Sequence, residues 1–286
     1  MNVRTDLALE QINEDNLPDG VKKYRRGSAF EITEIVIEND NHRASLGKGK
    51  GRYITLESGS LSRYCGNYED MAQELADELK SMLPDGEILV AGLGNRDITP
   101  DAIGPWTAEK VLATRHFRNE LKENEADFLA SLRPVSCLAG GVLGQTGIET
   151  AELIKSVCRE IKPSAVIAVD ALACSDISRL GTTIQLSDSG ISPGSGVANS
   201  RKELSAKSLG IPVIAVGIPT VVDMHTIMYS CGECEIPEDI PNMMVTPRDI
   251  DRLSERGAEL IACGTEPEAD VYETVYAFSY VPSTPS

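Results

Sequence analysis

The stretch Ile88-Leu-Val-Ala-Gly-Leu-Gly-Asn-Arg-Asp-Ile-Thr-Pro-Asp-Ala-Ile-Gly-Pro105 decides the fold of this chain. Its apolar, β-branched run from Ile88 to Ala91 predicts a buried parallel strand, and the two glycines that follow permit a tight exit from it. A helical pattern begins near Asp101. This carboxylate is therefore expected at the carboxyl end of a strand and at a helix N-terminus, either as a helix cap or as a functional acid.

A second carboxylate has equivalent surroundings, because the strand-like run Ala165-Val-Ile-Ala-Val ends in Asp170. Two parallel strands that end in acids bring those acids to one edge of a sheet, where ligands bind in open α/β sheets. The pair favours a functional site over capping. We expect the glycine loop 140–147 and the small-residue loop 187–199 at the same edge.

Strands and helices alternate through most of the chain, which predicts an α/β fold of three layers: a mixed, mostly parallel sheet with helices on both faces. The expected strands cover 30–37, 52–57, 88–91, 135–139, 165–170, 182–186 and 211–217. The expected helices cover 68–83, 101–117 and 148–161, with two more that begin after the caps Thr220 and Thr246, and 121–132 is expected as an acidic helix or loop.

Residues 1–29 are polar and rich in Asn and Asp, which predicts an exposed arm ahead of a single α/β domain at 30–286. An acidic, Pro-containing stretch at 229–242 is interpreted as a short insertion in that domain.

The formal net charge of −17 argues against binding to nucleic acid or to an anionic membrane, since both need a basic face. Two basic clusters, Lys22–Arg26 and Lys48–Arg52, are either contact patches for an acidic partner or solvated loops. No secretory signal or membrane span is visible, and the seven cysteines are odd in number, so reduced thiols in the cytoplasm are expected. Cys231 and Cys234 form a weak zinc or redox motif.

The absence of several known motifs from the sequence excludes the kinds of chemistry that depend on them. Gly92-Leu-Gly-Asn95 has no third glycine at dinucleotide-binding spacing, and no phosphate-binding loop occurs. None of the three histidines falls in a glycine-rich loop at a strand end, so a Ser or Cys nucleophile lacks its base. A site lined by acids repels phosphate and suits a divalent metal or an acid/base pair that activates water. The acids in question are Asp97, Asp101, Asp170 and Asp188, and the histidines are His42, His116 and His225.

Several long motifs together resemble the germination protease family of endospore-forming bacteria, in the family's order from Val3 to about Asp251. They are Val3-Arg-Thr-Asp-Leu-Ala8, Gly92-Leu-Gly-Asn95, Thr99-Pro-Asp-Ala-Ile-Gly-Pro105, Gly141-Val-Leu-Gly-Gln-Thr-Gly-Ile-Glu-Thr150, Val166-Ile-Ala-Val-Asp-Ala-Leu172, Thr183-Ile-Gln-Leu-Ser-Asp-Ser-Gly-Ile-Ser-Pro-Gly-Ser-Gly196, Arg201-Lys-Glu-Leu204, Ile211-Pro-Val-Ile-Ala-Val-Gly-Ile-Pro-Thr-Val-Val-Asp223 and Met244-Val-Thr-Pro247.

The resemblance implies an aspartic-type endopeptidase that degrades small acid-soluble spore proteins in the spore core during germination. It also implies a zymogen, a homotetramer, no cofactor, and the phosphorylase/hydrolase-like fold of hydrogenase maturation proteases. By motif position, the catalytic aspartates are Asp101 and Asp170. The supporting or substrate-binding positions are Asn95, Asp97, Gly141, Gly144, Asp188 and Ser195.

Two alternatives stay open on the same fold. The hydrogenase maturation relatives bind a metal at the positions of Asp101 and Asp170, but they add a histidine ligand that has no match here, so the metal-free reading is favoured. A nucleoside- or metal-binding protein without proteolytic activity is the other alternative. The chain also departs from its family: Ser192 replaces a common histidine, the segment between Asp223 and Met243 is short, and the tail from Gly264 differs.

The N-terminal order Thr5-Asp-Leu-Ala-Leu-Glu10 is similar to the motif cleaved in the family's substrates: an acid, a large apolar residue, Ala and, after one residue, Glu. We therefore hypothesise that the chain processes itself between Asp6 and Leu7. The arm would obstruct the cleft near Asp101 and Asp170 until it is removed.

Overall fold

A computed structural model of the chain describes residues 5–11, 18, 20–40, 47–63, 67–117, 132–194, 202–230, 232 and 241–265. These residues form one nine-stranded sheet in the order β1-β2-β3-β7-β8-β6-β4-β5, with β9 paired to β8. The strands are β1 (Val21–Arg26), β2 (Glu31–Ile37), β3 (Gly51–Glu57), β4 (Ile88–Gly92), β5 (Val135–Ala139), β6 (Ala165–Cys174), β7 (Thr183–Ser187), β8 (Val213–Asp223) and β9 (Met244–Val245).

The sheet is mixed, which confirms that part of the prediction, and its parallel pairs are confined to β5, β4, β6 and β8. It is not mostly parallel, because the other five strand pairs among the described residues are antiparallel. The strands β1, β2, β3 and β7 form an antiparallel wing, and β7 runs antiparallel to β8. Residues after β7 therefore leave the sheet on the opposite side from residues after β6.

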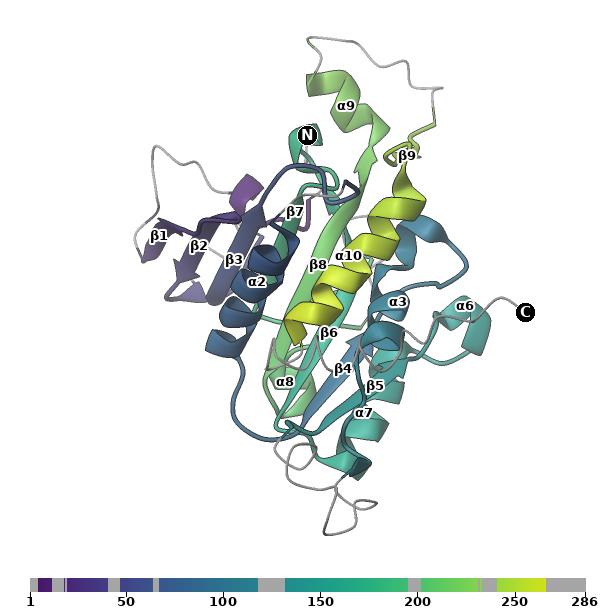
Figure 1. Cartoon of the computed structure of the whole chain (residues 1–286). Coiled ribbons are helices and arrows are strands. Elements are labelled where there is room, and N and C mark those ends of the chain that lie inside the picture. The colour runs from purple at the N-terminus through teal and green to yellow at the C-terminus, as the bar shows by residue number, and fades with distance from the viewer. Residues whose placement is uncertain are drawn as a thin grey trace, which may run out of the picture.

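Helices cover both faces, so the expected three layers are confirmed. In Figure 1, α2, α3 and α10 lie in front of the sheet, and α7 and α8 belong to the other face. The helices are α2 (Tyr68–Met82), α3 (Ile103–Lys110), α6 (Leu143–Thr146), α7 (Thr150–Ile161), α8 (Ala206–Leu209), α9 (Met224–Ser230) and α10 (Ile250–Thr265), with 3₁₀ turns η1 (Leu9–Gln11), η3 (Thr99–Asp101) and η4 (Ile177–Arg179).

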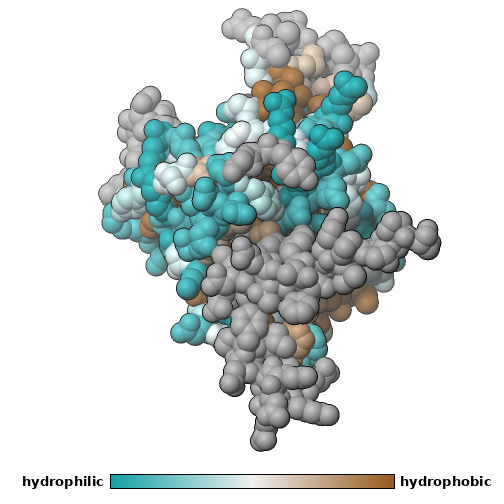
Figure 2. All heavy atoms as spheres, in the orientation of Figure 1, coloured by the Kyte–Doolittle hydropathy of each residue, from teal (hydrophilic) through white to brown (hydrophobic). Residues whose placement is uncertain are grey.

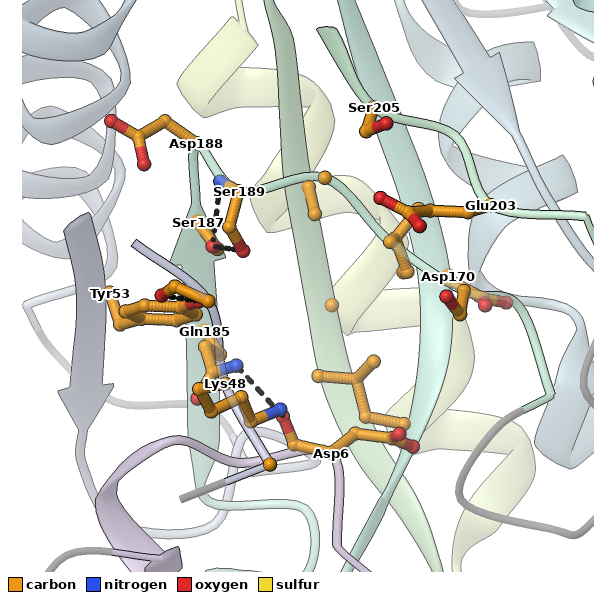
Figure 3. Close-up of a pocket in the computed structure, with 18 of the residues that line it drawn as sticks. Asp6, Lys48, Tyr53, Asp170, Gln185, Ser187, Asp188, Ser189, Glu203 and Ser205 are labelled. Carbon is orange, nitrogen blue, oxygen red and sulfur yellow. Dashed lines mark hydrogen bonds between the residues drawn. The ribbon is translucent and has the colours of Figure 1, made fainter. Parts of the chain in front are cut away.

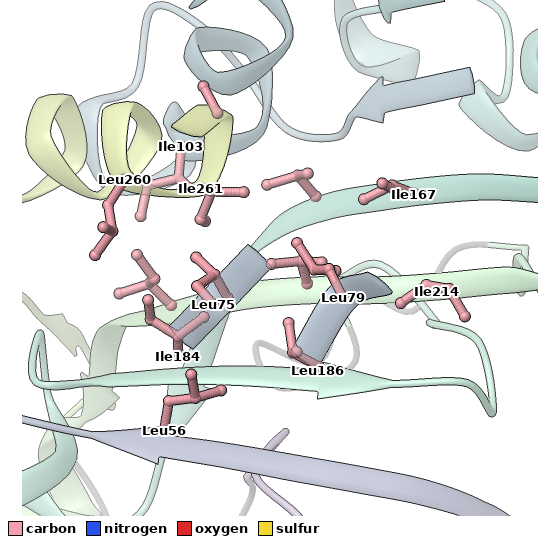
Figure 4. Close-up of a cluster of buried hydrophobic side chains, with 14 of the residues drawn as sticks. Leu56, Leu75, Leu79, Ile103, Ile167, Ile184, Leu186, Ile214, Leu260 and Ile261 are labelled. Atoms are coloured by element: carbon pink, nitrogen blue, oxygen red, sulfur yellow. The ribbon is translucent and has the colours of Figure 1, made fainter. Parts of the chain in front are cut away.

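The largest core lies between the front helices and the sheet. Figure 4 shows Leu75 and Leu79 of α2 with Leu260 and Ile261 of α10 against aliphatic side chains of the central strands. Burial of such side chains stabilises a fold by roughly 1.5–3 kcal/mol each. The outer surface of this side, in Figure 2, is mostly hydrophilic, with hydrophobic residues gathered over α9.

The central strand β6 is apolar on both faces, as a buried parallel strand must be. Ala165, Ile167 and Val169 contribute to the front core, whereas Val166 and Ala168 contribute to the rear one. Because side chains alternate along a strand, the next rear-facing position is Asp170.

Several predicted boundaries were wrong. The helix expected over 101–117 is the turn η3 followed by the shorter α3. Thr220 is not a cap: β8 continues through it to Asp223, and its buried hydroxyl donates to the Pro100 carbonyl at 2.6 Å. Helix α10 begins at Ile250, so Thr246 is not its N-cap. The acidic helix or loop expected over 121–132, most of 229–242 including Cys231 and Cys234, and the tail after 265 lie outside the described residues.

The prediction of an exposed N-terminal arm was also wrong. Leu7 and Ala8 have no exposed surface, and Leu9 is 5% exposed. Part of the expected arm is strand β1, which pairs with β2. In the described part of the chain, no helix is both long and apolar enough to cross a bilayer.

Candidate active site

Asp170 lies on the rear face of β6, with only 5% of its surface exposed. Its Oδ1 accepts the N–H of Ala171 at 3.0 Å. Burial raises the pKa of this carboxyl well above its ordinary value, and the nearby charges of Asp101 and Asp6 raise it further. A carboxylic acid of this kind keeps its proton at a pH where an exposed aspartate has lost it.

Asp101 ends the turn η3 after β4, and its side chain does not cap α3. Its Oδ2 accepts the N–H of Asn95 at 2.7 Å, so the carboxylate bridges back across its own loop. Gly94 makes the approach possible: its φ is +107°, and a Cβ there would lie 2.2 Å from the Asp101 carbonyl oxygen. Burial raises the pKa of Asp101, and the Asn95 hydrogen bond opposes that rise.

The ends of β4 and β6 hold the two acids side by side. The N–H of Leu93 donates to the Val169 carbonyl at 2.8 Å, directly before Asp170. Gly104 of α3 sits on this junction, where a Cβ would lie 2.2 Å from the Leu93 carbonyl oxygen and 2.3 Å from that of Val169. A glycine at this position lets α3 pack close enough to seat Asp101 beside Asp170, and the two carboxyls are near enough to interact.

Asn95 and Asp97 organise the loop around Asp101. The Asn95 Oδ1 accepts the Asp97 N–H at 3.0 Å and the Gln145 Nε2 at 2.8 Å, and Gln145 also donates to the Asp97 Oδ2 at 3.2 Å. Gln145 belongs to the glycine loop, so these bonds tie that loop to the one that carries Asp101. Asp97 is exposed.

The remaining predicted residues lie further away. Gly141 adopts a left-handed φ of +68°, and its carbonyl accepts from Thr150, whereas Gly144 is exposed with open space around it. Asp188 accepts the Arg52 N–H at 2.7 Å beyond the end of β7. The expectation that all loops converge at one edge is wrong for Asp188, because β7 runs antiparallel to β8. Ser195 lies outside the described residues.

Two adjoining cavities open on the rear face, of about 450 and 380 Å³. Asp170 and Asp6 line both of them; Asp101 lines the smaller one and Asp188 the larger. Pro193 and Gly194, from the loop after β7, also reach the smaller cavity. The two cavities share Asp6 and Asp170, so Asp101 and Asp170 face one cleft that the N-terminal segment crosses. Figure 3 shows Asp6 and Asp170 in the larger cavity.

The segment crosses the cleft in a defined conformation. The Asp6 N–H donates to the Ala173 carbonyl of β6, and the Asp6 Oδ2 accepts the Ala173 N–H, both at 2.9 Å. Leu7 enters an apolar pocket formed by Leu172, Cys174 and Val222. The Asp6–Leu7 peptide thereby lies on β6 just beyond Asp170.

Glu10 is held as firmly as Leu7. Its Oε2 accepts the Ser175 N–H at 2.7 Å and the Ser175 hydroxyl at 2.5 Å, and its Oε1 accepts the Asp176 N–H at 3.1 Å. The Arg179 guanidinium is 3.7 Å away, and the Glu10 side chain is 2% exposed. These contacts form a binding site for a single carboxylate, that of the residue four positions after Asp6.

Serine side chains line the larger cavity, but no described histidine lies beside them as a base. Neither His116 nor His225 lines either cavity. Cys174 contacts Leu7, but burial, with nearby Glu10 and Asp176, raises its pKa to about 12 and keeps the thiol protonated. Among the described residues, no three His, Cys, Asp or Glu side chains are grouped as metal ligands.

The sequence interpretation missed the residues that hold the segment. Lys48 lies in a recognised basic cluster, which was interpreted as a contact patch for an acidic partner or as a solvated loop, yet its partner is Asp6 of the same chain. Gln185 is a buried amide on the rear face of β7. Its strand alternates polar and apolar residues, a pattern that predicts solvent exposure for Gln185, so no local signal identified it.

Comparison with known proteins agrees with the motifs. The germination protease family model matches residues 2–232. Germination protease from Clostridium tetani is 38% identical, over 92% of this chain and 94% of that protein, and the one from Bacillus velezensis is 43% identical, over 86% and 72%. Among solved structures, the [NiFe] hydrogenase maturation protease HycI from Thermococcus kodakarensis KOD1 aligns with a TM-score of 0.34 and 18% identity, over 66% of this chain and 98% of that one. The extent of the family match and these identities show that the chain belongs to the germination protease family.

Proposed function

We propose that this chain is an endopeptidase that begins the degradation of small acid-soluble spore proteins during germination, with water activated by Asp101 and Asp170. Family membership supports a protease that acts in germination. The observation that carries the catalytic assignment is that the chain's own Asp6–Leu7 peptide lies in the cleft lined by the two acids.

The pair acts as one unit with a single proton between its members. Asp170 is the more deeply buried acid, and burial favours its neutral form, so it carries the proton. Asp101, held by the Asn95 N–H, is the carboxylate that takes a proton from water as the water oxygen bonds to the carbonyl carbon. Asp170 then protonates the leaving amide nitrogen when the C–N bond breaks.

We also propose that the chain is a zymogen that cuts itself between Asp6 and Leu7. Each position of the expected motif has its own surroundings: Asp6 on Ala173, Leu7 in its pocket, Ala8 fully buried in a core cluster, and Glu10 on Ser175. The segment blocks the cleft, and release of the residues up to Asp6 opens it.

A metal-dependent peptidase and a non-proteolytic binding protein are the rivals on this fold. Incubation of the purified full chain at mildly acidic pH in excess chelator, followed by N-terminal sequencing, separates the three. The acid pair predicts a new N-terminus at Leu7 with chelator present. A metal enzyme is processed only without chelator, and a binding protein stays intact in both conditions.

The resemblance further supports a homotetramer in the cytoplasm of the spore core. Sedimentation equilibrium of the processed protein tests the assembly, and a monomer at micromolar concentration would contradict it.

A further inference from the structure

The carbonyl oxygen of Asp6 accepts two side-chain donors. Lys48 Nζ lies 2.7 Å from it and Gln185 Nε2 lies 3.0 Å from it. Figure 3 shows both side chains on one side of Asp6, with Asp170 on the other. This carbonyl belongs to the bond at which processing is proposed.

The sheet explains the spacing of these groups. Gln185 pairs with Gly217 of β8, and Gly217 pairs with Asp170 of β6, so the three residues form one row across three strands. Neighbouring strands lie about 4.8 Å apart, which separates the outer two by roughly 10 Å. Gly217 puts no side chain between them; a Cβ there would lie 2.6 Å from Leu172 and 2.7 Å from the Asp170 carbonyl oxygen. The Leu172 side chain packs over Gly217, and both residues line the larger cavity together with Gln185 and Asp170.

The orientation of the Gln185 amide is fixed by a second bond. Its Oε1 accepts the N–H of Ala8 at 2.7 Å, so its Nε2 points to the Asp6 carbonyl. The amide is 7% exposed, and its hydrogen bonds are therefore little screened by water.

Lys48 supplies a cation at the same oxygen. Burial lowers the pKa of its ammonium group, while the charges of Asp6 and Glu10 raise it. The net shift of the Lys48 pKa is downward, and the two acids of the docked segment limit it at the oxygen where that segment needs a strong donor.

We propose that Lys48 and Gln185 form the oxyanion-binding site of the protease; this rests on the proposed cleavage between Asp6 and Leu7. The water oxygen bonds to the Asp6 carbonyl carbon, and the π pair moves to the carbonyl oxygen, where both donors stabilise the negative charge. When the pair returns, the bond to the Leu7 nitrogen breaks, and that nitrogen takes its proton from the acid pair. Donors placed before the reaction lower the barrier because they do not reorganise during it.

The test compares first-order self-processing of the full chain in the wild type, Lys48→Met, Lys48→Arg and Gln185→Met. Loss of one oxyanion donor typically costs about 10²–10³-fold in rate, and we expect a loss of that size in Lys48→Met with partial recovery in Lys48→Arg. Lys50→Met is the matched control, because Lys50 is exposed and lines the same cavity; it should process at the wild-type rate.

A second readout separates chemistry from docking: hydrogen exchange at the Ala8 amide, measured in an Asp170→Asn background in which the segment stays uncut. Because Lys48 also holds the docked segment, Lys48→Met should lower this protection by about tenfold at most, well below the loss of rate. A Lys48→Met chain that processes within threefold of the wild type, or whose protection falls as far as its processing rate, overturns the oxyanion site and leaves the proposed function standing. A wild-type chain that is never cut between Asp6 and Leu7 overturns both.

Discussion

Replacement of Leu7 by Ala tests whether the N-terminal segment is docked as the structure has it. The Leu7 side chain is fully buried against Leu172, Cys174 and Val222. The substitution removes three carbon atoms from that pocket. At about 0.8 kcal/mol for each buried methylene, the docked state loses about 2.4 kcal/mol, and an unfilled cavity adds to the loss.

That free energy is measurable as local opening. In a processing-deficient Asp101→Asn background, the Ala8 amide donates to Gln185 and exchanges only when the segment undocks. With about 1.4 kcal/mol per tenfold change, Leu7→Ala should lower its protection factor roughly 50-fold. Leu7→Met, which conserves volume, should change it little. Ile177→Ala removes a side chain that is 52% exposed and serves as a further control. Equal protection in the Leu7→Ala and Leu7→Met variants would refute the docked conformation.

Three other outcomes follow from the site. The folded-state pKa of Asp170 is raised, so the folded protein binds more protons than the unfolded one at pH values above 3.8, and its stability falls as pH rises. Asp170→Asn should therefore raise the melting temperature at neutral pH. The gain in melting temperature should shrink as pH approaches 3.8. An unchanged melting temperature at neutral pH would argue against a desolvated acid. Glu10→Gln should weaken segment docking by about 2 kcal/mol. An added non-specific protease would then cleave within residues 5–11 roughly 30-fold faster. A wild-type cleavage rate would show that the carboxylate site contributes nothing to docking. Peptide hydrolysis by processed enzyme should give a bell-shaped pH profile, because activity needs a singly protonated pair. The raised pKa of Asp170 moves the alkaline limb of that profile above the usual carboxyl range. A flat rate from acidic to neutral pH would contradict the pair.

Local pattern was sufficient to predict where the acids lie. Asp101 and Asp170 follow apolar runs that pair as β4 and β6, and parallel strands that pair in register bring such residues together. The extents of the strands were harder to predict, because Asp170 and Thr220 are polar residues inside strands. The contacts that satisfy Thr220 come from Pro100, which is remote in sequence.

Two features could not be read from periodicity at all. Strand direction leaves no trace in a short pattern, so the antiparallel course of β7, which carries Asp188 away from Asp101, was not predicted. The N-terminal segment is polar apart from a few residues, and a polar stretch predicts solvent exposure. Its burial depends on partners supplied by Lys48, Ser175 and Gln185, each far along the chain.

The most direct test of the catalytic pair is the turnover of Asp101→Asn, Asp170→Asn and the double variant, each produced with Leu7 as its first residue so that the cleft is open, on a peptide that contains the chain's own residues 3–12. Asn keeps the size of each side chain and removes its ability to exchange a proton. Since the acids act as one unit, each single variant should lose nearly as much activity as the double variant, with far-ultraviolet circular dichroism unchanged. Near-wild-type turnover in either single variant, or losses that simply multiply in the double variant, would contradict the pair.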